Sequence, residues 1–481
     1  MSQAGIDPAA IRRLAEALAA EISRGSSSSG NAADGGADAL GDGVYPSIDA
    51  CVKASRTAFF AYNAIPLSKR MAIIDAIRAV CRREGRALAQ FAWEETGLGR
   101  VEDKVIKNAL VTEKTPGPEI LEPIARSGDR GLVLIEPAPF GVIGAITPVT
   151  NPTSTIICNA IGMLSAGNSV VFNVHPSAKR VSAFTVRLLN RTIVAAGGPP
   201  DLLTCVPNPT VAGANEMMKH PQIRLLVVTG GGAVVEAAMN SGKRAICAGP
   251  GNPPAVVDAT ADLDQAGRDI VMGHSFDNNV ICVDEKEVIV VDAVADALKA
   301  SMVRHGAVLL QPSDLPALEK AIFTKMAGPR GHATIDRELV GKDASVILKR
   351  LGKHAGPEAR CVLIEVPNDH PLVWTEQMMP VLPITRVRTV DEAIDLAVGA
   401  EGGCFHTATM HSHDIDALSR MARKCNTSIF VKNGRSVAGL GADGEGWTSF
   451  TIASPTGEGL TTPLSFSRWR RCTLVDRFRI V

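Results

Sequence analysis

The stretch from residue 142 to residue 174, VIGAITPVTNPTSTIICNAIGMLSAGNSVVFNV, contains the pattern that decides the fold. Short apolar runs at 142–146 and 170–174 predict two strands, and the segment from 154 to 166 between them predicts a helix. A strand, a helix and a second strand in succession are typical of parallel strands joined by a crossover helix. The stretch therefore predicts a parallel sheet of the α/β class.

The same alternation continues toward the C-terminus. We expect a helix at 178–196, a strand at 225–228, a helix at 233–240, a helix at 263–272, a strand at 288–291, a helix at 293–305, a strand at 362–365 and a helix at 390–398. Two α/β lobes are the economical interpretation, one at 44–257 and one at 258–445, with a C-terminal return at 446–481.

Two further regions complete this division. Between Val44 and about Pro116 the pattern is helical, with one long helix around Arg78 and another that closes at Gly97. A strand at about 131–137 and a tail at 470–481 that alternates like a strand are suited to pairing with another element or subunit.

The first 43 residues stand apart from this body. Asp7-Pro8 is a helix opening, and the apolar residues that follow recur at spacings of three and four. These are Ile11, Leu14, Leu18 and Ile22. Residues 23–43 are rich in Gly, Ser, Ala and Asp and predict a flexible linker. A frayed terminus is one interpretation, but the tether favours a docking helix at 1–22 whose stripe, within residues 6–22, binds another protein.

Composition excludes several classes of protein. The 481 residues contain 50 Lys and Arg against 50 Asp and Glu, so no net positive field favours nucleic acid. No apolar run reaches the ~18 residues of a membrane span, and the start lacks the features of a secretory signal. Ten scattered cysteines without a Cys-x-x-Cys pair favour a reducing compartment and argue against disulfides or a zinc site. We therefore expect a soluble cytoplasmic protein without a bound metal.

Three segments with chemical potential follow predicted strands. They are 147–152, which contains Asn151, the His175-Pro176-Ser177 segment, and the glycine turn at 229–232. Ligands of parallel sheets bind outside the carboxyl ends of the strands, where a glycine turn lets backbone amides approach phosphate. Each segment also has a plain structural interpretation: a helix cap for Asn151, a structural histidine, and a tight turn without ligand.

Cys282 lies in a loop between Asn278-Asn279 and the strand predicted at 288–291. A thiolate is a good nucleophile toward carbonyl groups. With ten cysteines in the chain, most are expected to be small buried hydrophobes. The residues alone therefore leave both interpretations of Cys282 open.

Taken in this order, the segments resemble the aldehyde dehydrogenase superfamily from about Val44 to the C-terminus. The corresponding elements are Thr150-Asn151-Pro152 for the asparagine turn, His175-Pro176-Ser177 for the family's Lys-Pro-Ser, Thr229-Gly230-Gly231 for the phosphate turn, Cys282 for the nucleophile and Glu376 for the ribose-binding glutamate. The resemblance implies a Rossmann-type cofactor domain, an α/β catalytic domain and a small oligomerisation hairpin, in a dimer or tetramer.

One departure indicates the branch of the superfamily. Hydrolytic members carry a water-activating glutamate where this chain has no carboxylate between Ala245 and Val257. Water, with a pKa near ~15.7, needs a general base, whereas a thiol of pKa about 8.5 has little such need. The missing carboxylate, the Gly-Pro-Gly-Asn string at 249–252 and His175 in place of lysine indicate coenzyme A as acyl acceptor.

The resemblance to this CoA-acylating branch implies how NAD and coenzyme A are used. Cys282 would form a thioester with a short aldehyde, with the oxyanion held by Asn151 and the Cys282 amide. The cofactor-binding residues that it implies are Thr147, Pro148, His175, Ser177, Thr229, Gly230, Gly231, Gly249 and Glu376. Two alternatives stay open: a hydrolytic aldehyde dehydrogenase that releases free acid, and a non-catalytic packing protein.

The C-terminal segment from Thr456 to Ile480 is similar to that of propionaldehyde dehydrogenases of bacterial microcompartments. Those enzymes carry an N-terminal amphipathic encapsulation helix on a linker, and residues 6–43 show the same type of pattern. The resemblance therefore implies propionaldehyde as substrate, a microcompartment shell or cargo protein as partner, and a location inside such a compartment.

Overall fold

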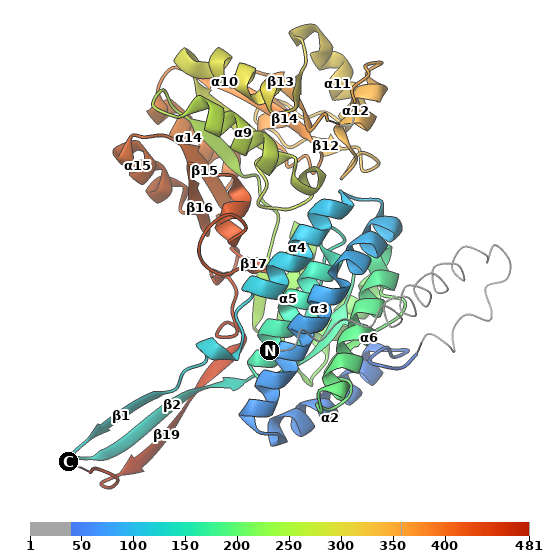
Figure 1. The fold of residues 1–481 in the computed structure, drawn as a ribbon, viewed down its shortest axis with the longest axis vertical. Helices are drawn as coiled ribbons and strands as arrows, with labels where there is room; N and C mark the ends of the chain where they lie inside the picture. The colour runs from blue at the N-terminus through green and yellow to red at the C-terminus, as the bar shows by residue number, and fades with distance from the viewer. Residues whose placement is uncertain (1–39, 357, 481) are drawn as a thin grey trace, which may run out of the picture. The chain divides into compact units, whose positions relative to one another are not determined.

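Two parallel β-sheets with helices packed on both faces organise the chain (Figure 1). The structure is a computed structural model and describes residues 40–356 and 358–480. The helix predicted at 1–22 and most of the linker predicted at 23–43 lie outside the described residues. From Asp42 onward the chain forms one compact unit, and its predicted division into two domains at residue 257 stays a prediction.

The first sheet has the strand order β5-β4-β3-β6-β7, and all its neighbouring strands are parallel. Its strands are β3 (Val142–Ile146), β4 (Ser169–Asn173), β5 (Leu203–Cys205), β6 (Ile223–Thr229) and β7 (Ala245–Ala248). Its helices are α5 (Pro152–Ser165), α6 (Lys179–Ala195), α7 (Val211–Lys219) and α8 (Gly232–Met239). The alternation predicted from the sequence is confirmed here, with ends that differ by one or two residues.

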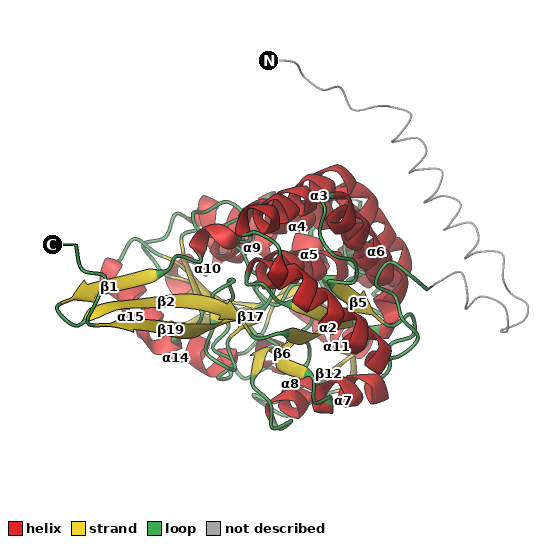
Figure 2. Ribbon diagram, turned by 90° about the horizontal axis from the view of Figure 1, so that it is seen from below, coloured by secondary structure: helices red, strands yellow, loops and turns green. Residues whose placement is uncertain are grey.

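Alternate residues of these strands enter different hydrophobic clusters, as the period of two in a strand requires. On β3, Ile143 and Ala145 pack with residues of α3, α5 and α6, whereas Val142 and Ile146 pack with residues of α2, α7 and α8. Figure 2 shows these two sets of helices on opposite sides of the sheet. Both faces are covered, which explains why the strands are almost entirely apolar.

The second sheet has the order β10-β13-β14-β9-β8-β15-β16 and is also parallel. Its strands are β8 (Pro254–Val257), β9 (Glu287–Val291), β10 (Ala307–Leu309), β13 (Cys361–Glu365), β14 (Val381–Val387), β15 (Thr407–His411) and β16 (Ile429–Lys432). Its helices are α9 (Leu263–His274), α10 (Asp292–Arg304), α11 (Leu315–Ile322), α12 (Ala344–Arg350), α13 (Pro371–Trp374), α14 (Val390–Glu401) and α15 (Ile415–Cys425). The sheet already includes β8, which lies just before the boundary predicted at residue 257.

Among the residues that the structure describes, three α-helices precede the first sheet. They are α2 (Ile48–Ala64), α3 (Leu67–Thr96) and α4 (Val101–Lys114). The prediction of two helices between Arg78 and Gly97 is wrong, because α3 is one helix of 30 residues. It contains no proline, and its one glycine, Gly85, is held by Asn108 of α4 through a 3.0 Å hydrogen bond to its carbonyl. The helix ends at Gly97, whose φ of 63° favours glycine.

A third, antiparallel sheet is formed by β1 (Ile124–Gly128), β2 (Gly131–Pro139) and β19 (Ser467–Val475), which lie side by side in Figure 1. The predicted strand at 131–137 is confirmed. The predicted C-terminal strand is also present, but it begins before Arg470 and ends at Val475 rather than at the terminus. The short elements that remain are η1 (Pro118–Ile120), η2 (Pro176–Ala178), η3 (Phe276–Asn279), η4 (Pro312–Asp314), η5 (Ser436–Leu440), β11 (Phe323–Lys325), β12 (Thr334–Ile335), β17 (Ile452–Ala453) and β18 (Gly459–Leu460).

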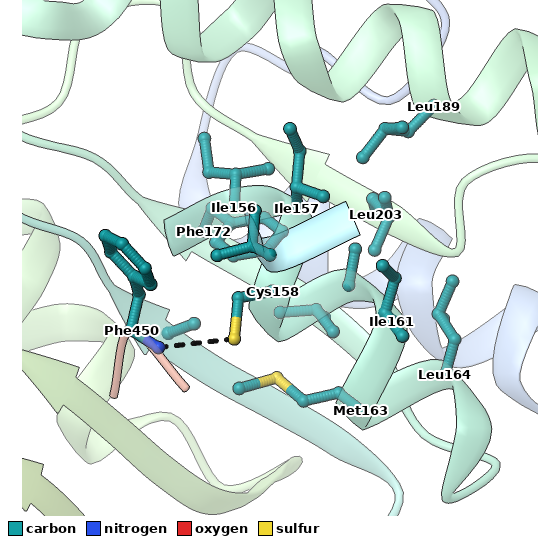
Figure 3. Packing of buried hydrophobic residues seen from close by; sticks show 14 of the residues in the cluster. Ile156, Ile157, Cys158, Ile161, Met163, Leu164, Phe172, Leu189, Leu203 and Phe450 are labelled. Atoms are coloured by element: carbon teal, nitrogen blue, oxygen red, sulfur yellow. Dashed lines mark hydrogen bonds between the residues drawn. The ribbon is translucent and has the colours of Figure 1, made fainter. Parts of the chain in front are cut away.

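Helix α5 is buried along its whole length. Figure 3 shows Ile156, Ile157 and Ile161 of this helix packed among apolar side chains from neighbouring elements. The Phe450 backbone N–H donates a hydrogen bond of 3.4 Å to Cys158 Sγ. Because α5 is fixed on all sides, the residue that precedes it, Asn151, is held in place.

Within residues 40–356 and 358–480, no helix is both long and apolar enough to cross a membrane.

Candidate active site

All the predicted cofactor-binding residues except Glu376, which follows α13, lie at one edge of the first sheet. Thr147 and Pro148 follow β3, His175 and Ser177 follow β4, Thr229 ends β6 and Gly230 and Gly231 follow it, and Gly249 follows β7. Because these strands are parallel, their carboxyl ends meet at the same edge. The structure thus brings together residues that are about 100 positions apart in the sequence.

The glycine turn at this edge has space for a ligand. A Cβ added at Gly231 or Gly232 would meet no atom within 4 Å, whereas one at Gly230 would lie 2.7 Å from Val234 Cγ1. Beside the turn, the Thr229 hydroxyl lies 3.1 Å from that of Thr451. Open glycine backbone ahead of helix α8, at the carboxyl edge of a parallel sheet, fits the phosphates of a dinucleotide.

Asn151 stands directly before α5, but its side chain makes no capping hydrogen bond. Its Oδ1 instead accepts a hydrogen bond of 2.8 Å from Lys107 Nζ, and its Nδ2 donates one of 3.1 Å to Thr150 Oγ1. The alternative interpretation of this side chain as a helix cap is therefore wrong.

Cys282 lies in the loop between η3 and β9 and is partly exposed, unlike most cysteines of the described residues. Burial above all, with the charge of Glu376, raises the pKa of its thiol to about 12, although the charge of Lys286 and the backbone N–H of Cys282 act to lower it. The backbone N–H of Cys282 thus favours negative charge beside it, as a donor of an oxyanion hole must.

The turn between β7 and β8 passes directly beside Cys282. A Cβ added at Gly251 would lie 3.0 Å from the Cys282 carbonyl oxygen and 3.0 Å from His406 Cγ. The Gly251 N–H hydrogen-bonds to the Glu376 carboxylate, whose pKa is raised by burial and lowered by the charge of Lys286. Glu376, Gly251 and Cys282 thus form one constellation.

His406 is a residue of this site that sequence reasoning missed. Burial, together with the charge of Lys286, lowers the pKa of its imidazole to about 4, so the ring is neutral. Its Nδ1 lies 2.9 Å from Thr407 Oγ1, and its buried Nε2 has no hydrogen-bond partner within the described part of the chain. A neutral imidazole with an unpaired nitrogen is a candidate base.

Two buried lysines were also missed. Lys286 donates hydrogen bonds to the Asn279 carbonyl (3.0 Å), to Asn279 Oδ1 (2.7 Å) and to the Ile281 carbonyl (3.3 Å). Lys107 binds Asn151 and pairs with the Asp277 carboxylate. No sequence signal distinguishes either lysine from a surface lysine, because their partners come from other elements or from a loop that folds back.

A parallel sheet with an open glycine turn at its carboxyl edge, next to a cysteine loop, is typical of a nucleotide-dependent enzyme with a thiol nucleophile. The model of the aldehyde dehydrogenase family matches residues 42–447. The chain belongs to the aldehyde dehydrogenase family.

Curated relatives and solved structures agree with this assignment. The chain is 51% identical over 440 residues to the acetylating acetaldehyde dehydrogenase EutE of Salmonella typhimurium, which covers 91% of this chain and 94% of that protein. It is 48% identical, with a TM-score of 0.87, to Rhodopseudomonas palustris propionaldehyde dehydrogenase with bound CoA and an acylated cysteine, over 91% of this chain and 99% of that one. It is 44% identical, with a TM-score of 0.88, to propionaldehyde dehydrogenase from the Clostridium phytofermentans fucose utilisation bacterial microcompartment, over 91% of this chain and 100% of that one.

Proposed function

We propose that the chain is a CoA-acylating aldehyde dehydrogenase, which converts a short aldehyde, coenzyme A and NAD(P)+ to an acyl-CoA and NAD(P)H. One observation carries this proposal. The turn that lies against Cys282 is Ala248-Gly249-Pro250-Gly251-Asn252, and it offers no carboxylate to activate water. A thiol acceptor has little need of such a base.

In the first half of the reaction, the Cys282 thiolate adds to the aldehyde carbonyl carbon, and the carbonyl oxygen becomes an oxyanion. The Asn151 amide and the Cys282 backbone N–H stabilise this oxyanion as hydrogen-bond donors. Thr229, Gly230 and Gly231 at the carboxyl edge of the first sheet would hold NAD(P)+, which would supply the acceptor for the hydride that leaves the former aldehyde carbon. Cys282 then carries the acyl group as a thioester.

In the second half, the thiol of coenzyme A loses its proton and attacks the thioester carbonyl, and the Cys282 thiolate leaves. His406 is placed to accept a proton in this region, because its imidazole is neutral and lies against Gly251 beside the Cys282 carbonyl. We expect His406→Ala to lower turnover while NAD(P)+ binding stays measurable.

The decisive test of the nucleophile is Cys282→Ala. We expect this variant to bind NAD(P)+ and to form no NAD(P)H from aldehyde. Wild-type turnover in the variant would contradict the assignment. An inactive wild-type enzyme, with coenzyme A and aldehyde present, would favour the non-catalytic packing protein instead.

In the hydrolytic alternative, Glu376 is the candidate base that would activate water, because this carboxylate is close enough to raise the pKa of Cys282. The products distinguish the two reactions. We expect acyl-CoA and little free acid when coenzyme A is present, and a single acylation without further turnover when it is absent. Sustained release of free acid, abolished in Glu376→Gln, would establish hydrolysis.

The aldehyde is one of two or three carbons in the relatives whose names specify it. We propose propionaldehyde as the substrate, in keeping with the microcompartment relatives. The test compares kcat/KM for acetaldehyde, propionaldehyde and butyraldehyde with coenzyme A present. A highest value for acetaldehyde or butyraldehyde would contradict the proposal.

We further propose that the enzyme works inside a bacterial microcompartment and that residues 1–22 attach it to a shell or cargo protein. The structure of the C. phytofermentans microcompartment enzyme supports the compartment, and the amphipathic pattern at 6–22 supports the attachment. Deletion of residues 1–22 should leave kcat unchanged and abolish co-purification with compartments. Loss of activity, or retained co-purification, would contradict an independent docking helix.

We also propose that β1, β2 and β19 pair subunits in a dimer or tetramer. The side chains of β1 and β19 are largely exposed, including Trp469 at 56% and Leu474 at 43%, and those of β2 are mostly half-buried. Exposed apolar side chains on a small sheet are typical of an interface. Trp469→Glu should lower the mass measured by analytical ultracentrifugation, and an unchanged mass would contradict this role.

A further inference from the structure

Lys107 of α4 is a fully buried lysine that the mechanism above does not use. Its Nζ donates hydrogen bonds to Asn151 Oδ1 at 2.8 Å and to the Thr150 carbonyl at 3.3 Å, and it also pairs with the Asp277 carboxylate. An ammonium group has three protons to donate. Lys107 therefore places one proton on each of three oxygens from two different segments of the site.

The first consequence concerns the orientation of the Asn151 amide. A lysine ammonium only donates, so the amide must turn its oxygen toward Lys107 and its NH₂ group away. The contact is buried, so water cannot take the place of the ammonium. Lys107 thereby decides that Asn151 presents its donating end to a developing oxyanion.

The second consequence concerns the loop that carries Cys282. Asp277, Asn278 and Asn279 are consecutive residues with φ values of 45°, 56° and 66°. Residues other than glycine rarely adopt such a backbone conformation. Such backbone persists only where its surroundings hold it. Here the start of the loop is tied to α4 and the residue before it, because Lys107 and Lys104 bind the Asp277 carboxylate and Arg100 N–H donates to it at 2.7 Å.

We propose that Lys107 is a positioning residue that sets the two donors of the oxyanion hole, the Asn151 amide and the Cys282 backbone N–H, relative to each other. A single ammonium group spans the two segments that supply these donors. The inference rests on the proposed roles of Cys282 and Asn151, and it adds a residue that touches neither aldehyde nor nucleotide in that mechanism.

The charge of Lys107 gives the proposal a pH signature. Burial lowers the pKa of Lys107 to about 8. Lys104 on the same helix lowers it too, whereas Asp277 and Asp284 raise it. Lys107 is therefore a charged ammonium below this pH and a neutral amine above it. The neutral amine no longer attracts the Asp277 carboxylate and has one hydrogen-bond donor fewer. We expect the ratio of the wild-type kcat to that of Lys107→Arg, which keeps its charge, to fall as the pH rises through this range, because the rising thiolate fraction of Cys282 affects both enzymes alike.

The test is a double-mutant cycle of Lys107→Met with Asn151→Ala, followed by initial rates of NAD(P)H formation with aldehyde and coenzyme A. Loss of one oxyanion-hole donor typically lowers kcat by about 100- to 1,000-fold. We expect Asn151→Ala to show a loss of this size and Lys107→Met to lose about 10- to 100-fold with little change in the Kd for NAD(P)+. The double variant should lose less than the product of these two losses, because the effect of Lys107 that acts through Asn151 is already gone in Asn151→Ala. Lys114→Met is the matched control, because Lys114 lies on the same helix and binds two backbone carbonyls away from the site; its kcat should stay at the wild-type value.

The outcomes separate this inference from the proposed function. A wild-type kcat in Lys107→Met, or losses that multiply in the double variant, would overturn the role of Lys107 while that of Asn151 stands. A wild-type kcat in Asn151→Ala would overturn the oxyanion role and the Lys107 inference together. If Lys107→Met does not fold, the comparison with Lys107→Arg still tests the proposal, because arginine keeps its charge at higher pH. A ratio of the wild-type kcat to that of Lys107→Arg that stays constant across this pH range would overturn the proposal.

Discussion

Gly251→Ala tests whether the turn between β7 and β8 holds Cys282 by close contact. The added methyl group would lie 3.0 Å from the Cys282 carbonyl oxygen and 3.0 Å from His406 Cγ, and its neighbours must retreat by a few tenths of an ångström. The backbone of Gly251 lies outside the left-handed region, so alanine can adopt its conformation without strain. Any effect of the substitution then comes from the steric contacts of the added methyl group. Both crowded groups belong to the proposed active site.

The magnitude follows from these distances. Overpacking of a tightly packed site typically lowers the free energy of unfolding by about 1–3 kcal/mol. Because a misplacement of ~1 Å can lower a rate by about 100-fold, a shift of a few tenths of an ångström should lower kcat by about 5- to 10-fold. The loss should appear in kcat more than in the KM for the aldehyde.

The assay combines initial rates of NAD(P)H formation with denaturant unfolding. Gly328→Ala is the matched control, because a Cβ there would meet no atom within 4 Å and its φ lies outside the range that favours glycine. We expect Gly328→Ala to match the wild type in both measurements. A wild-type kcat and unfolding midpoint in Gly251→Ala would refute the argument that this turn is packed against the nucleophile.

Two further predictions concern charge and packing. Glu376→Gln should lower the pKa of Cys282 and Lys286→Met should raise it, because the carboxylate raises this pKa and the ammonium lowers it. The free enzymes are treated with iodoacetamide at one alkaline pH, and mass spectrometry follows alkylation of the peptide that contains Cys282. Alkylation should be faster in Glu376→Gln and slower in Lys286→Met than in the wild type. The opposite order would show that other charges dominate at the sulfur. Ile157→Ala should lower the free energy of unfolding by about 2–5 kcal/mol, because Ile157 is fully buried among the side chains of Figure 3. A loss below about 1 kcal/mol, measured by denaturant unfolding, would show that α5 tolerates a cavity and does not fix Asn151 rigidly.

Much of the strand and helix pattern of the first sheet could be predicted from the sequence because its signals are local, although β5, α7 and β7 were not predicted. The runs at 142–146 and 170–174 are apolar, and turn residues separate them from the helices. Parallel pairing then brings Thr147, His175 and Thr229 to one edge without further information. The error at α3 is local as well, because the helix-ending signal at Glu94 to Gly97 does not show where that helix begins, and it ends the same helix that contains Arg78.

The charges around the nucleophile could not be predicted in this way. Lys107 meets Asn151 from 44 positions away and Asp277 from 170 positions away, so both contacts exist only after α4, α5 and the Cys282 loop have packed together. His406 enters the site because β15 runs next to β8, which follows the Gly251 turn. Cys282 itself was singled out by resemblance, since nothing local separates it from the other nine cysteines.

The high pKa of Cys282 slows both halves of the reaction, and this explains why a buried lysine is useful beside it. A thiol with a pKa of about 12 forms little thiolate at neutral pH, which slows attack on the aldehyde. In the second half the same sulfur must leave as a thiolate, displaced by a thiol of ordinary pKa near ~8.5, and a more basic leaving group departs more slowly. Lys286 lowers the pKa of Cys282, so it favours both formation of the nucleophile and its departure. The charge of one side chain thus assists a reaction in which the same thiolate must first attack and then leave.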